Sequence, residues 1–173
     1  MLVLRCTQKF LKRVGPPVAE PPASTTALGD WYAQPLALGH QRYLLLVSGR
    51  SRLPMLMPAR DTKHVAAYFP AALSRVLEGL DVPAPVISRE IAETSEIVIA
   101  RTASRSGLGT LSDFSQMLKW RRWAEPEPDL TVEAVRLSRT PVGPLRPGWP
   151  DEVTLRLLGC GAPPRRGRGG QPA

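Results

Sequence analysis

Short apolar runs separated by turn-forming residues dominate the first third of the chain. Residues 2–6 form an apolar run, and a basic amphipathic segment follows at residues 8–14 before glycine and two prolines interrupt it. This pattern predicts a strand and a short helix that stops at residue 15. Residues 16–26 are proline-rich, so we expect them to cross the surface as extended chain.

Three further apolar runs lie between residues 31 and 58, and the turn-forming sequences between them predict an antiparallel meander. The middle run, residues 43–47, contains no polar residue, so we expect a central strand covered on both faces. Pro54 and Pro58 cannot donate ladder hydrogen bonds. The third run, residues 53–57, is therefore predicted to be an edge strand or an irregular one.

The second half of the chain shows mainly helical spacing. Asp61 or Thr62 can cap a helix that Pro70 either starts or kinks. Its apolar stripe consists of Phe69, Leu73, Val76, Leu77 and Leu80. Ile87 and Ile91 mark a shorter helix, and residues 97–99 are β-branched and predict another strand. Further helices are expected at residues 111–122, 130–137 and 150–158.

These elements predict an α+β fold with a small, mostly antiparallel sheet packed with several helices. A doubly wound parallel sheet requires a regular alternation of strands and helices, which the pattern lacks. We expect a single domain over residues 1–159. Residues 160–173 are mostly Gly, Pro and Arg and predict a disordered basic tail.

A basic, glycine-bearing loop at residues 101–110 lies between the predicted strand at 97–99 and an amphipathic helix. The start of that helix would direct free backbone N–H groups and its positive dipole end toward the loop, where phosphate or carboxylate can bind. The loop lacks the Gly-Lys-Ser/Thr ending of a P-loop and does not match the dinucleotide-binding glycine pattern. Its candidate ligands are Arg101, Ser104, Arg105 and Ser106.

A plain strand-to-helix connection is the alternative interpretation of this loop. In that case Ser106 or Thr110 caps the helix, and the arginines are solvated or paired with Glu93 and Glu96.

The formal charge of +8 and the pI near 10.3 favour anionic partners such as nucleic acid or another anionic ligand. Arg50 and Arg52 place two of these charges in a second predicted turn, and we include them among the candidate binding residues. No run is long and apolar enough for a membrane span, and the two cysteines exclude a disulfide framework. We expect a cytoplasmic protein without a membrane association.

Candidate catalytic and metal-binding groups are few. His40 and His64 have no second ligand at metal-binding spacing, so we expect no metal site and no cofactor. Arg5 stands beside Cys6 and can lower the pKa of its thiol, which permits Cys–His catalysis. A buried structural role for Cys6 is the alternative, and we assign no catalytic residue.

Trp120 and Trp123 lie three residues apart near the end of a predicted helix, beside Arg121 and Arg122. They form a candidate protein-interaction surface if exposed, and otherwise pack in the core.

Four short sequence motifs, in this order, resemble those of an uncharacterised bacterial family known only as a domain of unknown function. They are Arg-Cys-Thr-Gln-Lys-Phe-Leu-Lys-Arg (5–13), Thr-Ala-Leu-Gly-Asp-Trp-Tyr-Ala (26–33), Leu-Pro-Met-Leu-Met-Pro-Ala-Arg-Asp (53–61) and Thr-Ala-Ser-Arg-Ser (102–106). The resemblance covers most of residues 2–158 and implies a compact bacterial domain without an assigned activity. The chain departs from the family pattern at Gln34, Gly107 and Leu111-Ser112, where Asn, an aliphatic residue and Met-Asn are usual.

These observations favour a binding or accessory module that recognises an anionic partner, for instance nucleic acid, over an enzyme. Two alternatives remain: a protein–protein interaction component of a small two-gene system, and an enzyme acting on a small anionic metabolite with Cys6 or His40 as the reactive group.

Overall fold

The computed structural model describes residues 1–102, 104–120, 129–145 and 148–161, and within these ranges the side chains of residues 61–63 and 144 are not described. Trp123 and almost all of the predicted tail therefore lie outside the described residues. No helix in these ranges is long and apolar enough to cross a membrane.

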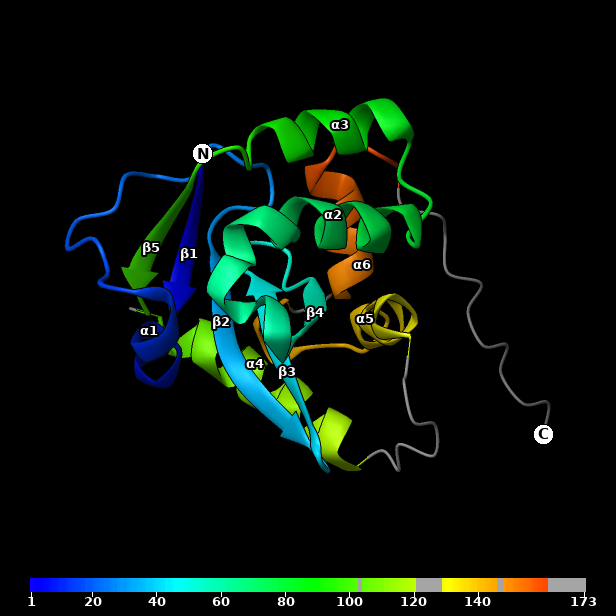
Figure 1. The fold of residues 1–173 in the computed structure, drawn as a ribbon. Coiled ribbons are helices and arrows are strands. Elements are labelled where there is room, and N and C mark those ends of the chain that lie inside the picture. Colours follow the sequence, from blue (N-terminus) through cyan, green and yellow to red (C-terminus); the bar gives the residue numbers. More distant parts are fainter. Residues whose placement is uncertain (103, 121–128, 146–147, 162–173) are drawn as a thin grey trace.

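Five strands form one mixed sheet in the order β4-β3-β2-β1-β5 (Figure 1). The strands are β1 (Leu2–Cys6), β2 (Trp31–Leu38), β3 (Gln41–Ser48), β4 (Pro54–Pro58) and β5 (Ile97–Arg101). Strands β2, β3 and β4 form the predicted antiparallel meander, while β1 runs parallel to both β2 and β5. The chain is thus a compact α+β domain with a mostly antiparallel sheet, as the sequence predicts.

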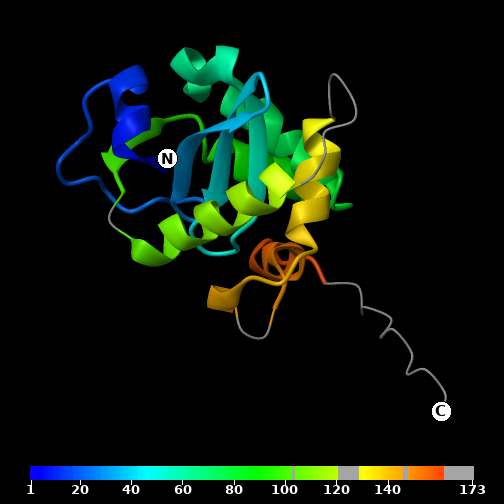
Figure 2. The same cartoon turned by 90° about the horizontal axis from the view of Figure 1, so that it is seen from below.

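Helices cover both faces of this sheet. The α-helices are α1 (Gln8–Val14), α2 (Val65–Glu78), α3 (Ala84–Ala92), α4 (Arg105–Trp120), α5 (Leu130–Ser138) and α6 (Pro150–Leu157), and two 3₁₀ helices are η1 (Ala59–His64) and η2 (Gly143–Leu145). Figure 2 shows α4 lying along the face of the sheet opposite α2. Two hydrophobic cores result, one beneath α1, α2 and α3 and one beneath α4.

Strand β3 shows why one sheet serves two cores. Leu44 and Leu46 belong to the core beneath α2, whereas Leu45 and Val47 belong to the core beneath α4. Because successive side chains of a strand point to opposite faces, a run without polar residues fills both cores. The predicted central strand is confirmed, and so is the edge position of β4, which ends the sheet.

The predicted start of α2 is wrong. Helix α2 begins at Val65 after η1, His64 occupies its N-cap position, and Pro70 lies within the helix rather than at its start. A start at Val65 places Val65 and Phe69 one turn apart on the buried stripe, where they are 3% and 0% exposed. This burial outweighs the backbone hydrogen bond that Pro70 cannot donate.

The predicted loop at residues 101–110 is also shorter than expected, because α4 already begins at Arg105. Gly107 and Gly109 are therefore helical residues. Propensity alone disfavours glycine within a helix by roughly 1 kcal/mol each, which is why the pattern indicated a loop.

Candidate functional site

Strands β1, β2 and β5 run parallel and point toward the same edge of the sheet, where β1 and β5 end together and β2 continues to Leu38. Cys6 at the end of β1 pairs with Ala33 of β2 and with Arg101 of β5. Helix α4 starts four residues beyond Arg101, and helices that follow parallel strands direct their N-termini toward this edge. The predicted basic loop thus lies where open α/β sheets commonly bind ligands.

Ser104 caps the first turn of α4. Its hydroxyl accepts a hydrogen bond from the Gly107 backbone N–H at 3.2 Å, and its carbonyl accepts the first helical bond, from Leu108, also at 3.2 Å. Thr110 instead donates its hydroxyl to the Ser106 carbonyl. The prediction that Ser106 or Thr110 is the cap is therefore wrong.

Arg52 joins the two arginine-bearing turns. Its Nη2 donates a hydrogen bond to the Ser106 hydroxyl at 2.8 Å, so the turn between β3 and β4 contacts the first turn of α4. Arg52 has φ +61°, which is unfavourable for a residue other than glycine. Its backbone is thus held in an unusual conformation that aims the guanidinium at α4.

The other two nitrogen atoms of the Arg52 guanidinium are buried. Nε and Nη1 of Arg52 are buried without a hydrogen-bond partner among the described residues. Burial lowers the pKa of Arg52, and the nearby Tyr32 phenol opposes this shift. A partly buried cation without a counter-ion is costly, and an anion nearby would lower that cost.

Gly107 lets α4 approach the sheet. A Cβ atom at this position would lie 2.8 Å from the ring of Tyr32, which is closer than carbon atoms pack. The ring of Tyr32 therefore occupies the space that a larger residue would fill. An aliphatic residue would not fit here without a shift of α4 or Tyr32.

Arg50 and Arg101 do not contact the Arg52–Ser106 pair. The side chain of Arg50 lies over Gly29, and its Nη1 donates to the Ala27 carbonyl at 3.3 Å. Arg101 is exposed and lines a hollow of about 480 Å³ together with Arg5 and residues of the proline-rich segment. The two turns thus adjoin through Arg52 and Ser106.

We call six predicted site residues, Arg50, Arg52, Arg101, Ser104, Arg105 and Ser106, the basic edge. Arg50, Arg101 and Arg105 are exposed. Within the described ranges none of its arginines forms an ion pair, so the predicted pairing with Glu93 or Glu96 does not occur. Glu93 instead accepts a hydrogen bond from Thr25.

A polar network that the sequence pattern did not predict lies beside this edge. Nε of Arg5 donates to Asp30 at 2.5 Å, Ser24 donates to the other oxygen of that carboxylate at 2.6 Å, and Nη1 of Arg5 donates to the Arg101 carbonyl at 3.4 Å. The available signal was Arg5 itself, a charged residue within an otherwise apolar strand. The network fixes the end of β5 from which Arg101 projects.

Cys6 is unsuited to act as a nucleophile. It is 1% exposed, and burial raises the pKa of its thiol to about 12. Arg5 does not lower this pKa, since its guanidinium is directed to Asp30. The structural role is thereby favoured, and the thiol remains protonated at neutral pH.

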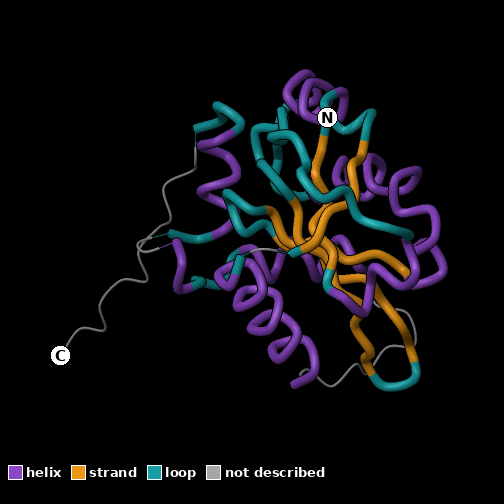
Figure 3. Tube along the Cα trace, turned by 90° about the vertical axis from the view of Figure 1, so that its left-hand side faces the viewer, coloured by secondary structure: helices purple, strands orange, loops and turns teal. Residues whose placement is uncertain are grey.

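Both histidines are exposed. The turn between β2 and β3, which carries His40, is the tip of a hairpin that extends from the sheet in Figure 3. No group of three His, Cys, Asp or Glu side chains suited to a metal ion occurs among the described residues.

Trp120 is 86% exposed at the end of α4, so the core-packing alternative is wrong for this residue. Helix α4 has 16 residues, which separates Trp120 from the basic edge by roughly 20 Å at about 1.5 Å per residue. Trp123 lies outside the described residues, so its surroundings stay a prediction.

Comparison with known proteins places the chain in a family without assigning an activity. No curated protein and no solved structure matches it significantly. Residues 3–153, which extend from β1 into α6, match a domain of unknown function, DUF6933. This match confirms the resemblance to an uncharacterised domain family and covers the sheet, its helices and the basic edge. The chain therefore belongs to the DUF6933 family.

Proposed function

We propose that this protein is a binding module whose basic edge recognises an anionic partner, with nucleic acid as the leading candidate. The hydrogen bond from Arg52 to Ser106 carries the proposal, because it brings the turn between β3 and β4 against the start of α4. Two segments that are distant in the sequence thereby present arginines on adjoining surfaces.

The chemistry of this edge suits a phosphate backbone. Arg101 and Arg105 are exposed and have no acidic partner among the described residues. The backbone N–H groups of Arg105 and Ser106 precede the first helical hydrogen bond of α4, so they lie at the positive end of its dipole. Guanidinium groups together with such N–H groups are typical phosphate ligands.

Binding to a fluorescent single-stranded oligonucleotide at low salt tests the proposal. The variant Arg101→Glu/Arg105→Glu should weaken the affinity at least about tenfold and reduce the salt dependence, since each lost phosphate contact lowers the logarithmic salt slope by about 0.7. The control Arg89→Glu/Arg156→Glu changes two exposed arginines of α3 and α6 and has the same net charge. Equal losses in both variants would show only an effect of net charge and contradict the proposal.

A second candidate function is that of a protein–protein interaction component, and the exposure of Trp120 favours it. A tryptophan that is 86% exposed buries a large apolar area when a partner covers it. Co-purification of a stable protein partner, lost on Trp120→Ala without a change in the far-UV circular dichroism spectrum, would support this function. A partner that is retained by the Trp120→Ala variant would exclude this residue as its anchor.

A further inference from the structure

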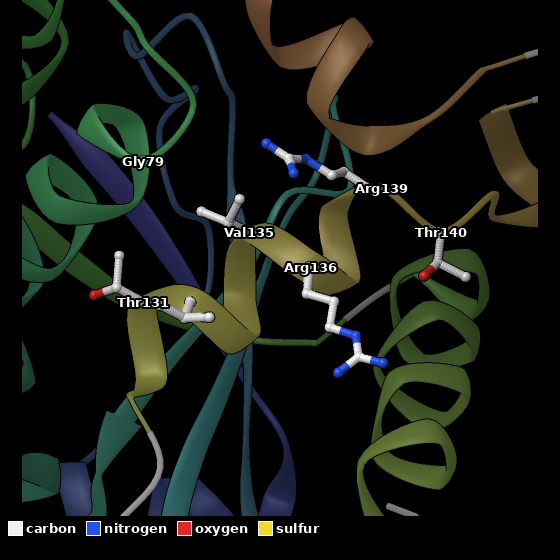
Figure 4. A pocket seen from close by; sticks show the side chains of 7 residues that line it. Gly79, Thr131, Val135, Arg136, Arg139 and Thr140 are labelled. Atoms are coloured by element: carbon white, nitrogen blue, oxygen red, sulfur yellow. The ribbon is translucent and has the colours of Figure 1, made fainter. Parts of the chain in front are cut away.

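Three adjoining hollows follow helix α5 on the side of the molecule that carries α2. The first, of about 600 Å³, lies along the outer side of α5 near Gly79, and Figure 4 shows the side chains that line it. The second, of about 250 Å³, lies between α2 and the start of α5 and shares Thr131 with the first. The third, of about 450 Å³, shares Pro58 and Leu130 with the second. We call these three hollows together the α5 groove.

Exposed arginines line the whole α5 groove. Arg136 and Arg139 line the first hollow, Arg75 the second, and Arg42 and Arg60 the third. All five are exposed, and Arg42, Arg75, Arg136 and Arg139 form no ion pair in the described part of the chain. None of them belongs to the basic edge, so the α5 groove is a second and separate positive surface.

The acidic group that lines the groove is already engaged. An oxygen of Asp129 accepts hydrogen bonds from the backbone N–H groups of Thr131 and Val132, at 2.9 and 3.1 Å, and so caps α5. This carboxylate therefore serves the helix rather than the arginines. The described residues that line the groove therefore carry a net positive charge, which complements an acidic partner.

Apolar side chains lie among these charges. Val132 of the first hollow is 59% exposed and Tyr68 of the second is 48% exposed. Ala71 and Leu130 extend the apolar surface between them. A partner that binds here can therefore bury apolar side chains between its acidic ones, which is the usual mode by which a groove accepts a peptide.

We propose that the α5 groove docks an acidic segment of a partner protein that carries aliphatic or aromatic residues between its carboxylates. The exposed arginines provide charge-assisted hydrogen bonds to the carboxylates, and Val132 and Tyr68 receive the apolar residues. An acidic peptide fits better than single-stranded nucleic acid because the exposed large apolar groups are one aliphatic and one aromatic side chain. Single-strand binding uses successive aromatic rings on which bases stack.

Fluorescence anisotropy with a fluorescein-labelled peptide of repeated Glu-Leu-Glu units tests the proposal on the full chain. The variant Arg136→Gln/Arg139→Gln should weaken peptide binding about tenfold, because two charge-assisted contacts are lost. The matched control Arg89→Gln/Arg156→Gln removes the same charge from α3 and α6 and should change the affinity by less than about twofold. Equal weakening in both variants, or no peptide binding at low salt, would overturn the proposal.

Two further measurements test the apolar contact at Val132 and the class of partner that binds in the groove. Val132→Ser should weaken peptide binding about threefold to fivefold, since it removes apolar area that the peptide covers, and an unchanged affinity would overturn the assignment of this contact. An oligo-dT that competes with the peptide and loses affinity in Arg136→Gln/Arg139→Gln would assign the groove to nucleic acid instead.

The test of the α5 groove is independent of the test of the function proposed for the basic edge. Arg101→Glu/Arg105→Glu should lower oligonucleotide affinity and leave peptide affinity within about twofold, because these residues line no part of the α5 groove. The converse is expected of Arg136→Gln/Arg139→Gln. Failure at one surface therefore leaves the other open to its own test.

Discussion

Cys6 and Arg52 show that sequence neighbours can fail to interact while residues far apart in the sequence form a hydrogen bond. Cys6 follows Arg5 in the sequence, yet consecutive residues of a strand point to opposite faces, so the guanidinium and the thiol are separated by the sheet. Arg52 is distant from Ser106 in the sequence but donates a hydrogen bond to it. Adjacency in the chain is thus a poor guide to electrostatic contact within a strand.

The raised pKa of Cys6 predicts a specific loss of stability at alkaline pH. Burial raises this pKa from 9.0 to about 12, so the thiol contributes stability fully below about pH 9, and this contribution is lost as the pH rises toward 12. The free energy of unfolding, measured by urea denaturation between pH 8 and the onset of alkaline unfolding, should decline more steeply for the wild type than for Cys6→Ala. Parallel declines in the two proteins would show that Cys6 does not carry this effect.

Helix α4 is the element whose position depends most on the tertiary structure. Its apolar residues Leu111, Phe114 and Leu118 were visible in the sequence, and all three are buried. Its first turns were not visible, because two glycines within seven residues are typical of a loop. The close approach to Tyr32 and the cap at Ser104 stabilise a helix there, and neither contact can be inferred from the local sequence.

Substitution of these two glycines should have opposite effects on stability. Gly107→Ala places a methyl group against the ring of Tyr32, where a Cβ would meet atoms at 2.8 Å, whereas a Cβ at Gly109 meets nothing within 4 Å. Overpacking costs typically 1–3 kcal/mol and exceeds the helix-propensity gain of about 1 kcal/mol, so Gly107→Ala should lower the free energy of unfolding by about 1 kcal/mol. Gly109→Ala should raise it by up to about 1 kcal/mol. Urea denaturation measures both, and stabilisation by Gly107→Ala would show that α4 does not pack against Tyr32 in this way.

The whole molecule is organised around a sheet that two cores share. Strand β3 contributes alternate residues to each core, and the predicted meander gives β3 partners on both sides. The parallel strands β1 and β5 come from distant parts of the chain and complete the sheet. Since disruption of β3 affects both cores, we expect them to unfold together.

Alanine substitutions on the two sides of β3 test this cooperativity. Leu45 and Leu46 are both fully buried, one in each core. Leu45→Ala and Leu46→Ala should each lower the free energy of unfolding by about 2–5 kcal/mol. In each variant, tryptophan fluorescence and far-UV circular dichroism should report one coincident urea transition. Separate transitions for the two signals would indicate that the cores unfold independently.

Several elements could be located from local signals in the chain alone. Apolar runs located β1, β3 and β5, prolines identified β4 as an edge strand, and helical spacing located α3, α5 and α6, because burial of one face imposes a period on neighbouring residues. The four exposed or partly buried arginines of the basic edge were also identified as candidates from their place in two predicted turns.

The way in which these elements meet depends on contacts between segments that are distant in the chain. The parallel placement of β1 between β2 and β5, the start of α4 at Arg105 and the contact of Arg52 with Ser106 all depend on residues that are far apart in the chain. The α5 groove has the same origin, since its arginines come from β3, η1, α2 and α5 and the segment after it. Such surfaces have no local period, because their residues are selected by position in space and not by spacing along the sequence.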